Sequence, residues 1–199
     1  DTDRSRGLGD VYKRQGAEYK IRFMLRKNVC EIMLDTTGDG LHKRGYRRNS
    51  MEAPIRETLA ATIADLGRVR RDSLVEDPFC GSGTLLIEAA QKAMNIAPGL
   101  KRRFAAERYS FVPAAVWAEQ RQKALAESKL DVGFEAFGYD IDPAAVALAN
   151  ANAKLAGVEK RCHFEVADVA DFAARSEAIV LTNPPYGERM SLSLIHISE

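Results

Sequence analysis

The chain has 199 residues, enough for one domain with a sizeable buried core, or for one domain and a piece of another. Its composition, 46% apolar and 29% charged residues, is that of a folded globular protein and argues against intrinsic disorder. No apolar run approaches the ~18 residues that a membrane helix needs, and the first residues lack the apolar centre of a secretory signal.

The formal net charge is +1, but the charges are unevenly distributed. Residues 1–72 hold 16 Lys and Arg against 11 Asp and Glu, whereas residues 73–199 hold 13 against 17. A basic first third is compatible with nucleic-acid contact, and an ordinary solvated surface is the alternative. The cysteines and histidines have neither CxxC nor metal-ligand spacing, so we expect no disulfide, no metal site and a cytoplasmic location.

Both ends of the chain differ in character from the sequence between them. Residues 1–15 have no helical or strand period, and residues 191–199 follow a motif abruptly. Both stretches resemble translated adapter or vector sequence and are left out of the fold prediction, with native tails as the alternative. If they are foreign, we expect the natural protein to extend beyond both ends.

Residues 18–36 alternate in polarity and predict two strands, with Ile21, Phe23 and Leu25 on one face and a turn over 26–28. A glycine-rich loop over 37–50 follows. It carries four basic residues: Lys43, Arg44, Arg47 and Arg48.

Residues 51–67 predict a helix, because a possible cap, a proline suited to the first turn and a terminal glycine stand at the right places: Ser50, Pro54 and Gly67. Its apolar positions recur at helical spacing and form the expected buried stripe: Ile55, Leu59, Ile63 and Leu66.

From residue 73 the pattern changes to strand, turn and helix in repetition, which is typical of a parallel α/β sheet. Short apolar runs that end in a polar residue predict four strands, over 73–77, 134–140, 162–168 and 177–182. Helices are expected over 85–94 and 142–157, and a partly helical insert over 95–133 interrupts the pattern.

The segment Asp77-Pro78-Phe79-Cys80-Gly81-Ser82-Gly83-Thr84 joins the first strand to its helix. A glycine-rich turn there lets the backbone approach a ligand, and the helix N-terminus points donors at it. The segment matches neither a Walker A loop nor GxGxxG, and Asp77 could accept hydrogen bonds from a cationic ligand group. A tight turn without a ligand is the alternative.

Two further acids end the next strands. Asp140 ends the second strand, where doubly wound folds place a ribose-binding carboxylate. Asp168 ends the third strand, where an adenine amino group would lie. A helix-capping role is the alternative for Asp140, and Asp142 beside it is expected to cap the following helix.

The fourth strand is followed by Asn183-Pro184-Pro185-Tyr186. Two prolines cannot serve a central strand, so the strand should end at Thr182. They leave carbonyls free, and with the Asn183 side chain these can accept both hydrogens of a planar exocyclic amine, while Tyr186 offers a face for stacking the base. A merely stiff loop is the alternative.

DPFCGSGT followed by NPPY resembles the class I S-adenosylmethionine-dependent amino methyltransferases. With LDTTGDGLHKRGYR, APIRETLAA, NIAPGLKRRFAAE and TNPPYGERM, residues 17–190 resemble more closely the THUMP-domain RNA methyltransferases, the bacterial 23S rRNA guanine-N2 methyltransferases and their relatives. The resemblance implies a Rossmann-like sheet, S-adenosylmethionine as cofactor and RNA as partner.

The resemblance also implies roles for residues. The cofactor would be held by the glycine-rich segment at its methionine part, by Asp140 at its ribose and by Asp168 at its adenine; the cofactor-binding set is Asp77, Phe79, Gly81, Gly83, Thr84, Asp140 and Asp168. The target base would lie at Asn183, Pro184, Pro185 and Tyr186. The basic residues Lys43, Arg44, Arg47 and Arg48 are expected to contact RNA phosphates, or else to pin the loop to the catalytic domain.

The expected domain organisation follows. Residues 16–49 would end the N-terminal, THUMP-associated RNA-binding region, and residues 50–190 would form a methyltransferase domain that lacks the family's last strands. The expected activity is methyl transfer to guanine N2 of rRNA. A DNA adenine-N6 methyltransferase and an inactive RNA-binding fragment are the alternatives.

Overall fold

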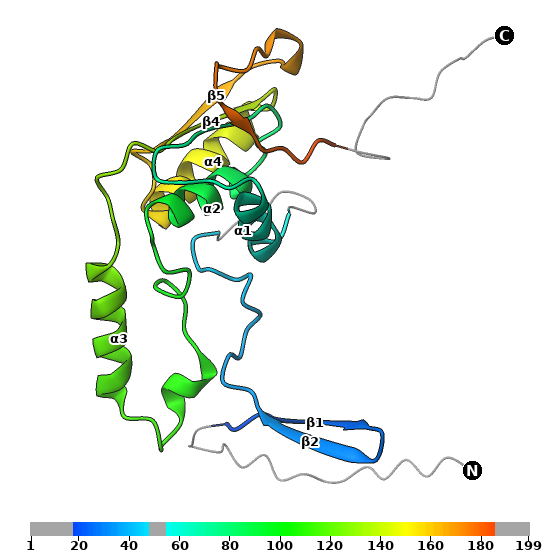
Figure 1. Cartoon of the computed structure of the whole chain (residues 1–199), viewed down its shortest axis with the longest axis vertical. Helices are drawn as coiled ribbons and strands as arrows, with labels where there is room; N and C mark the ends of the chain where they lie inside the picture. The colour runs from blue at the N-terminus through cyan, green and yellow to red at the C-terminus, as the bar shows by residue number, and fades with distance from the viewer. Residues whose placement is uncertain (1–17, 48–54, 186–199) are drawn as a thin grey trace, which may run out of the picture.

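The computed structural model describes residues 18–47 and 55–185. It consists of a parallel α/β body and a two-stranded hairpin at opposite ends of the molecule (Figure 1). The sequence predictions for the two tails and for four single residues lie outside the described residues: Arg48, Ser50, Pro54 and Tyr186.

The hairpin pairs β1 (Ile21–Arg26) with β2 (Val29–Leu34) in antiparallel register, as the alternation predicts. Lys27 and Asn28 form its turn with φ of 49° and 61°, the left-handed pair of a type I′ turn, which matches the twist of the flanking strands. Both faces are exposed, and Phe23 is 78% exposed. The apolar side chains of the hairpin are therefore not part of the hydrophobic core of the body.

Four parallel strands form the body's sheet in the order β5-β4-β3-β6. They are β3 (Leu74–Asp77), β4 (Glu135–Asp140), β5 (Cys162–Val166) and β6 (Ile179–Val180). This confirms the α/β, Rossmann-like prediction. β6 ends two residues before Thr182, although the Leu181 amide still donates to the Glu76 carbonyl at 2.9 Å and keeps the chain alongside β3.

Three helices, α1 (Glu57–Leu66), α2 (Thr84–Ala93) and α4 (Pro143–Ala156), pack side by side (Figure 1). Leu86 and Ile87 of α2 are completely buried in the core between α2 and the sheet. Asp142 caps α4, because its carboxylate accepts from the Ala144 amide at 2.8 Å, and Gly157 ends the helix with φ of 82°. Both boundaries were expected from the sequence.

The prediction for α1 was partly wrong. The helix begins at Glu57 rather than at residue 51, and Leu66 of the expected buried stripe is 78% exposed. The buried positions are Glu57, Ala60 and Ala64. Small side chains allow α1 to approach α2 closely, and Glu57 is buried because it has an ion-pair partner, so hydrophobicity alone selects the wrong face.

The insert between α2 and β4 contains η1 (Ala105–Arg108) and α3 (Ala114–Ala126). α3 lies apart from the other helices (Figure 1) and buries none of its residues fully. The Trp117 and Phe104 rings stack with centroids 5.6 Å apart, which attaches α3 to the rest of the insert.

The loop that leaves the hairpin is held by this insert. The guanidinium of Arg102, a buried residue, donates to three loop carbonyls, of Thr37 at 3.4 Å, Asp39 at 2.6 Å and Gly40 at 2.8 Å. We call residues 35–42 together with residues 101–110 the linker joint. Because its backbone acceptors are satisfied by a buried cation, the joint fixes where the hairpin leaves the body.

Candidate active site

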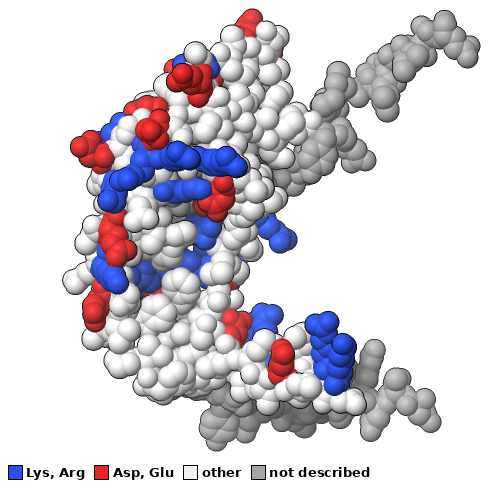
Figure 2. Space-filling view, in the orientation of Figure 1, with Lys and Arg blue, Asp and Glu red and all other residues white. Residues whose placement is uncertain are grey.

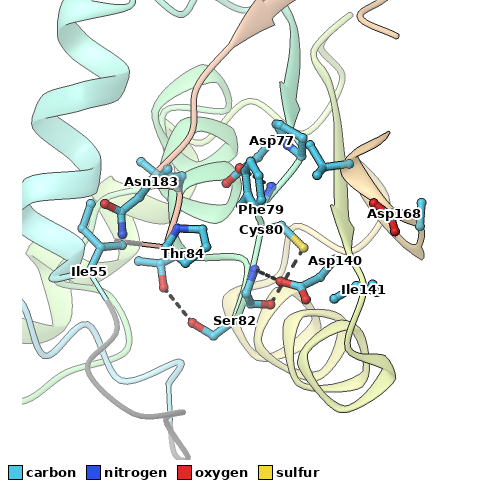
Figure 3. Close-up of a pocket in the computed structure, with 16 residues that line it drawn as sticks. Ile55, Asp77, Phe79, Cys80, Ser82, Thr84, Asp140, Ile141, Asp168 and Asn183 are labelled. Atoms are coloured by element: carbon cyan, nitrogen blue, oxygen red, sulfur yellow. Dashed lines mark hydrogen bonds between the residues drawn. The ribbon is translucent and has the colours of Figure 1, made fainter. Parts of the chain in front are cut away.

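A cavity of about 430 Å³ opens at the carboxyl ends of the parallel strands (Figure 3). This volume is that of a small-molecule site, and the edge of the sheet is where doubly wound folds bind their ligands. The cavity is lined by the ends of β3 and β4, by the segments that follow β3, β4, β5 and β6, by the start of α2 and by Ile55 before α1. The other lining residues are Asp77 to Ser82, Thr84, Leu85, Asp140, Ile141, Ala167 to Val169, Asn183 and Pro185.

The cavity brings together most of the residues that the sequence singled out. Asp77, Phe79, Gly81, Thr84, Asp140 and Asp168 line it, as do Asn183 and Pro185. Gly83 and Pro184 do not line it. Figure 3 places Asn183 and Ile55 on one side of the cavity and Asp140 and Asp168 on the other.

The two glycines of the turn serve different purposes. Gly81 has φ of 51°, and a Cβ built on it would meet no atom within 4 Å, so its backbone borders open space beside the cavity. Gly83 has φ of 77°, and a Cβ there would lie 2.8 Å from the Phe164 ring. Gly81 therefore leaves room for a ligand, whereas Gly83 allows α2 to start close against the sheet.

Asp140 holds the glycine turn in place. Its carboxylate accepts from the Gly81 amide at 2.9 Å (Figure 3) and from the Asp142 amide at 3.0 Å. Each carboxylate oxygen has a further lone pair, so the side chain can still accept from a ligand. The capping role considered for Asp140 falls instead to Asp142.

Asp77 is a buried carboxyl at the base of the cavity, only 1% exposed. Its pKa is raised to about 7, chiefly by burial and to a lesser degree by the nearby Asp140 carboxylate, while hydrogen bonds from Phe79 and Thr182 oppose the shift. The ionised form of a buried carboxyl with a pKa near 7 is strongly stabilised by a cationic partner. The same burial raises the pKa of the Cys80 thiol, which keeps it protonated.

The segments that follow β4 and β5 contribute an acid and two apolar groups. Asp168 is exposed and accepts from the Ala170 amide at 2.9 Å, which starts η2 (Val169–Asp171). Val169 and Ile141, the latter 69% exposed, also line the cavity. Sequence reasoning missed both apolar residues. The signal in the sequence was an apolar residue directly after each strand-end acid, Ile141 after Asp140 and Val169 after Asp168. An exposed apolar side chain in such a loop does nothing for the fold, which points to a ligand.

The three described basic residues of the 37–50 loop do not share one environment. Lys43 is exposed and lies 3.5 Å from Asp39. Arg44 pairs with Glu88 at 3.4 Å and Arg47 with Glu57 at 3.2 Å, with side chains only 12% and 13% exposed. The two arginines thus favour the pinning role that the sequence left open, whereas Lys43 stays a candidate for phosphate contact.

In residues 18–47 and 55–185 no helix is long and apolar enough to cross a membrane. Over the same part of the chain, no three His, Cys, Asp or Glu side chains gather as metal ligands would.

The chain was compared with protein families and with individual proteins. Residues 44–193 match the family model described as RMKL-like, methyltransferase domain. Ribosomal RNA large subunit methyltransferase K/L of Shewanella baltica (strain OS195) is 44% identical over 183 residues, 89% of this chain and 26% of that protein. YpsC of Bacillus subtilis (strain 168) is 41% identical over 182 residues, 91% of this chain and 47% of that protein.

Solved structures agree with the fold. The structure of SMU.472 complexed with SAH has 40% identity and a TM-score of 0.80, covering 88% of this chain and 46% of that one. A Listeria monocytogenes str. 4b F2365 structure, titled as a predicted N6-adenine-specific DNA methylase, has 41% identity and a TM-score of 0.82, covering 88% and 47%.

The chain thus spans about half the length of YpsC and about a quarter of the K/L enzyme. The family model covers most of the chain, including the glycine turn, the strand-end acids and Asn183. On that match and on the geometry of the cavity, the chain belongs to the RMKL-like methyltransferase domain family.

Proposed function

We propose that this protein transfers a methyl group from S-adenosylmethionine to the exocyclic N2 amine of a guanine in ribosomal RNA, in the cytoplasm, with 23S rRNA as the expected substrate. The observation that carries the proposal is one cavity lined both by the glycine turn with its strand-end acids and by Asn183 and Pro185. A site for the methyl donor and a site for an amine would therefore adjoin each other.

The residues present fit S-adenosylmethionine. Gly81 leaves open space where a side chain would stand, and Asp77 offers a buried acceptor for a cationic ammonium group. Asp140 has acceptor capacity left for ribose hydroxyls, and Ile141 and Val169 offer apolar surface for an adenine ring. The homologous SMU.472 was solved with SAH, the demethylated form of this cofactor.

When bound, the cofactor supplies an electrophilic methyl group on a sulfonium sulfur. The chain's own contribution is to orient the acceptor. The lone pair of an exocyclic amine is delocalised into its ring, which makes the nitrogen a poor nucleophile. If Asn183 Oδ1 and a proline carbonyl accept the two amine hydrogens, they favour the localised, tetrahedral nitrogen, and the rigid prolines keep these acceptors in place.

RNA as the acceptor is favoured by the K/L relative, whose name states a ribosomal RNA substrate, and by the resemblance of the 37–47 loop to RNA enzymes. Guanine N2 is proposed on the resemblance to the guanine-N2 methyltransferases alone. Adenine N6 in DNA is a second candidate, because the Listeria structure of similar identity is titled as a DNA methylase. Both share the same amine chemistry, so the acceptor must be tested directly.

The test uses the intact protein, radiolabelled S-adenosylmethionine and two acceptors: protein-free 23S rRNA and genomic DNA from a strain that lacks adenine methylation. Label in N2-methylguanosine of the rRNA is expected after nucleoside analysis. Label only in the N6-methyl-2′-deoxyadenosine of the DNA would favour the second candidate over the first. Cofactor affinity without transfer to either acceptor would support the inactive, RNA-binding alternative.

A further inference from the structure

Arg44 and Arg47 lie in the segment that leads from the linker joint to α1, and they contact different parts of the body. Arg44 donates to Glu88 at 3.4 Å and Arg47 donates to Glu57 at 3.2 Å, and both glutamates are almost fully buried. The two guanidinium groups are therefore comparable in exposure, in charge partner and in position along the chain. Any difference between them must come from their other contacts.

Arg47 has two contacts that Arg44 lacks. The same guanidinium nitrogen donates to the Ile55 carbonyl at 3.1 Å and lies 3.5 Å from Thr84 Oγ1. Ile55 and Thr84 both line the cavity. Ser82 Oγ lies 3.1 Å from Thr84 Oγ1 (Figure 3) and also lines the cavity, so polar contacts continue from Arg47 through Thr84 to Ser82.

These contacts join segments that are distant in sequence. Ile55 precedes α1, whereas Thr84 is the first residue of α2 and follows the glycine turn. A guanidinium has five N–H donors in a fixed plane and can serve several acceptors at once, which an ammonium on a flexible chain does less well. The Glu57 carboxylate neutralises its charge, so the group holds position without adding a net charge to the wall.

We propose that Arg47 is a positioning residue for the cofactor site: it sets the wall formed by Ile55 and Thr84 and thereby the affinity for S-adenosylmethionine. This inference rests on the proposed use of that cofactor. It assigns Arg47 a role that differs from phosphate contact, and it makes the linker from the hairpin part of the cofactor site's support. Arg44, which contacts no lining residue in the described chain, has a stabilising role only.

The experiment measures SAH affinity by calorimetry and melting temperature, both on the intact protein without RNA. Four variants are compared: Arg47→Ala, Arg47→Lys, Arg44→Ala and Arg44→Lys. Each variant weakens or removes a contact with a buried glutamate, so all four should lower the melting temperature. We expect SAH affinity to fall about tenfold in the Arg47 variants, which corresponds to ~1.4 kcal/mol, and to stay within about twofold in the Arg44 variants.

Arg47→Lys keeps the charge opposite Glu57 and is the decisive variant if Arg47→Ala does not fold. An Arg47→Lys protein that binds SAH as tightly as the parent overturns the proposal. So does an Arg44→Lys protein that loses the same affinity at the same loss of melting temperature. A parent protein that binds SAH but does not methylate rRNA would contradict the proposed function and leave the role of Arg47 unaffected.

Discussion

The cavity edge and the linker joint are built from the same residue types but use them in opposite ways. Both contain glycines and charged side chains at the ends of regular elements. In the joint, Arg102 is buried and three carbonyls accept from it, so the region is closed. At the cavity edge, Asp77, Asp140 and Asn183 keep acceptor capacity toward open space, so the region is ready for a ligand.

The contrast lies in where the remaining hydrogen-bonding capacity points. In the joint, the Arg102 guanidinium donates into the protein and only its Nε has no partner, whereas at the cavity edge the carboxylates of Asp77 and Asp140 border space that a ligand can enter. The prediction for this molecule is a clean separation. Changes at the joint should affect stability and leave cofactor affinity alone, whereas changes at the cavity edge should affect binding or rate.

The largest effect is expected at Asn183. Asn183→Ala should lower the methyl-transfer rate by about 10²–10³-fold, because it removes an acceptor that gains strength as the amine becomes tetrahedral. SAH affinity should hardly change, since Asn183 lies across the cavity from Asp140 and Asp168 (Figure 3). Single-turnover methylation of rRNA measures the rate. Asn183→Asp keeps an acceptor and should retain more activity; equal rates for parent and Asn183→Ala would reduce the segment to a stiff loop.

Asp77 should make the stability of the ligand-free protein depend on pH. Because its folded pKa of about 7 lies above the unfolded value, stability should fall as pH rises from about 4 to 7 and level off above that range. Asp77→Asn should remove this fall and stabilise the protein at pH 8 by roughly 2–4 kcal/mol. The same variant should bind SAH more weakly. Chemical denaturation at pH 5 and pH 8 measures the first effect, and parallel profiles for the two proteins would refute it.

Arg102 tests the other side of the comparison. Arg102→Met should lower the free energy of unfolding by about 2–3 kcal/mol, because three hydrogen bonds from a buried guanidinium to loop carbonyls are lost. Its neighbour Arg103 is exposed, so Arg103→Met is a matched control with little expected effect. SAH affinity should stay at the parental value in both variants. A loss of affinity in Arg102→Met at temperatures where it remains folded would break the separation between joint and cavity.

Asp140 acts in both ways, since it shapes the glycine turn and borders the cavity. Asp140→Ala should weaken SAH binding by about 1.5–3 kcal/mol, the scale of hydrogen bonds to a charged group. Asp142→Ala removes the cap of α4 and should cost about 1 kcal/mol of stability with affinity unchanged. Calorimetry on both proteins separates ligand contact from local support. Unchanged affinity in folded Asp140→Ala would exclude it as a cofactor ligand.

The sequence predicted what depends on local patterns. Strand-end acids, the glycine turn and the caps at Asp142 and Gly157 follow from the position of polar residues relative to short apolar runs, and parallel strands bring their ends together. The buried face of α1 and the partners of Arg44 and Arg47 depend on distant segments, so periodicity could not reveal them. A basic loop looks alike in sequence whether its arginines meet solvent or buried glutamates.

The smallest effect is expected at Lys43, the exposed cation among basic neighbours of which two are paired with buried glutamates. Figure 2 shows Lys and Arg side chains spread over this face of the body and at the outer end of the hairpin, so no single one should dominate RNA affinity. If Lys43 contacts one phosphate, Lys43→Gln should lower the slope of log affinity against log salt by about 0.7–0.9.

Arg44→Gln is the control: it should lower the melting temperature and leave the slope as it is, because the Arg44 guanidinium faces Glu88. Filter binding of an rRNA fragment across a salt series measures the slope. Identical slopes for Lys43→Gln and the parent would exclude Lys43 as a phosphate contact.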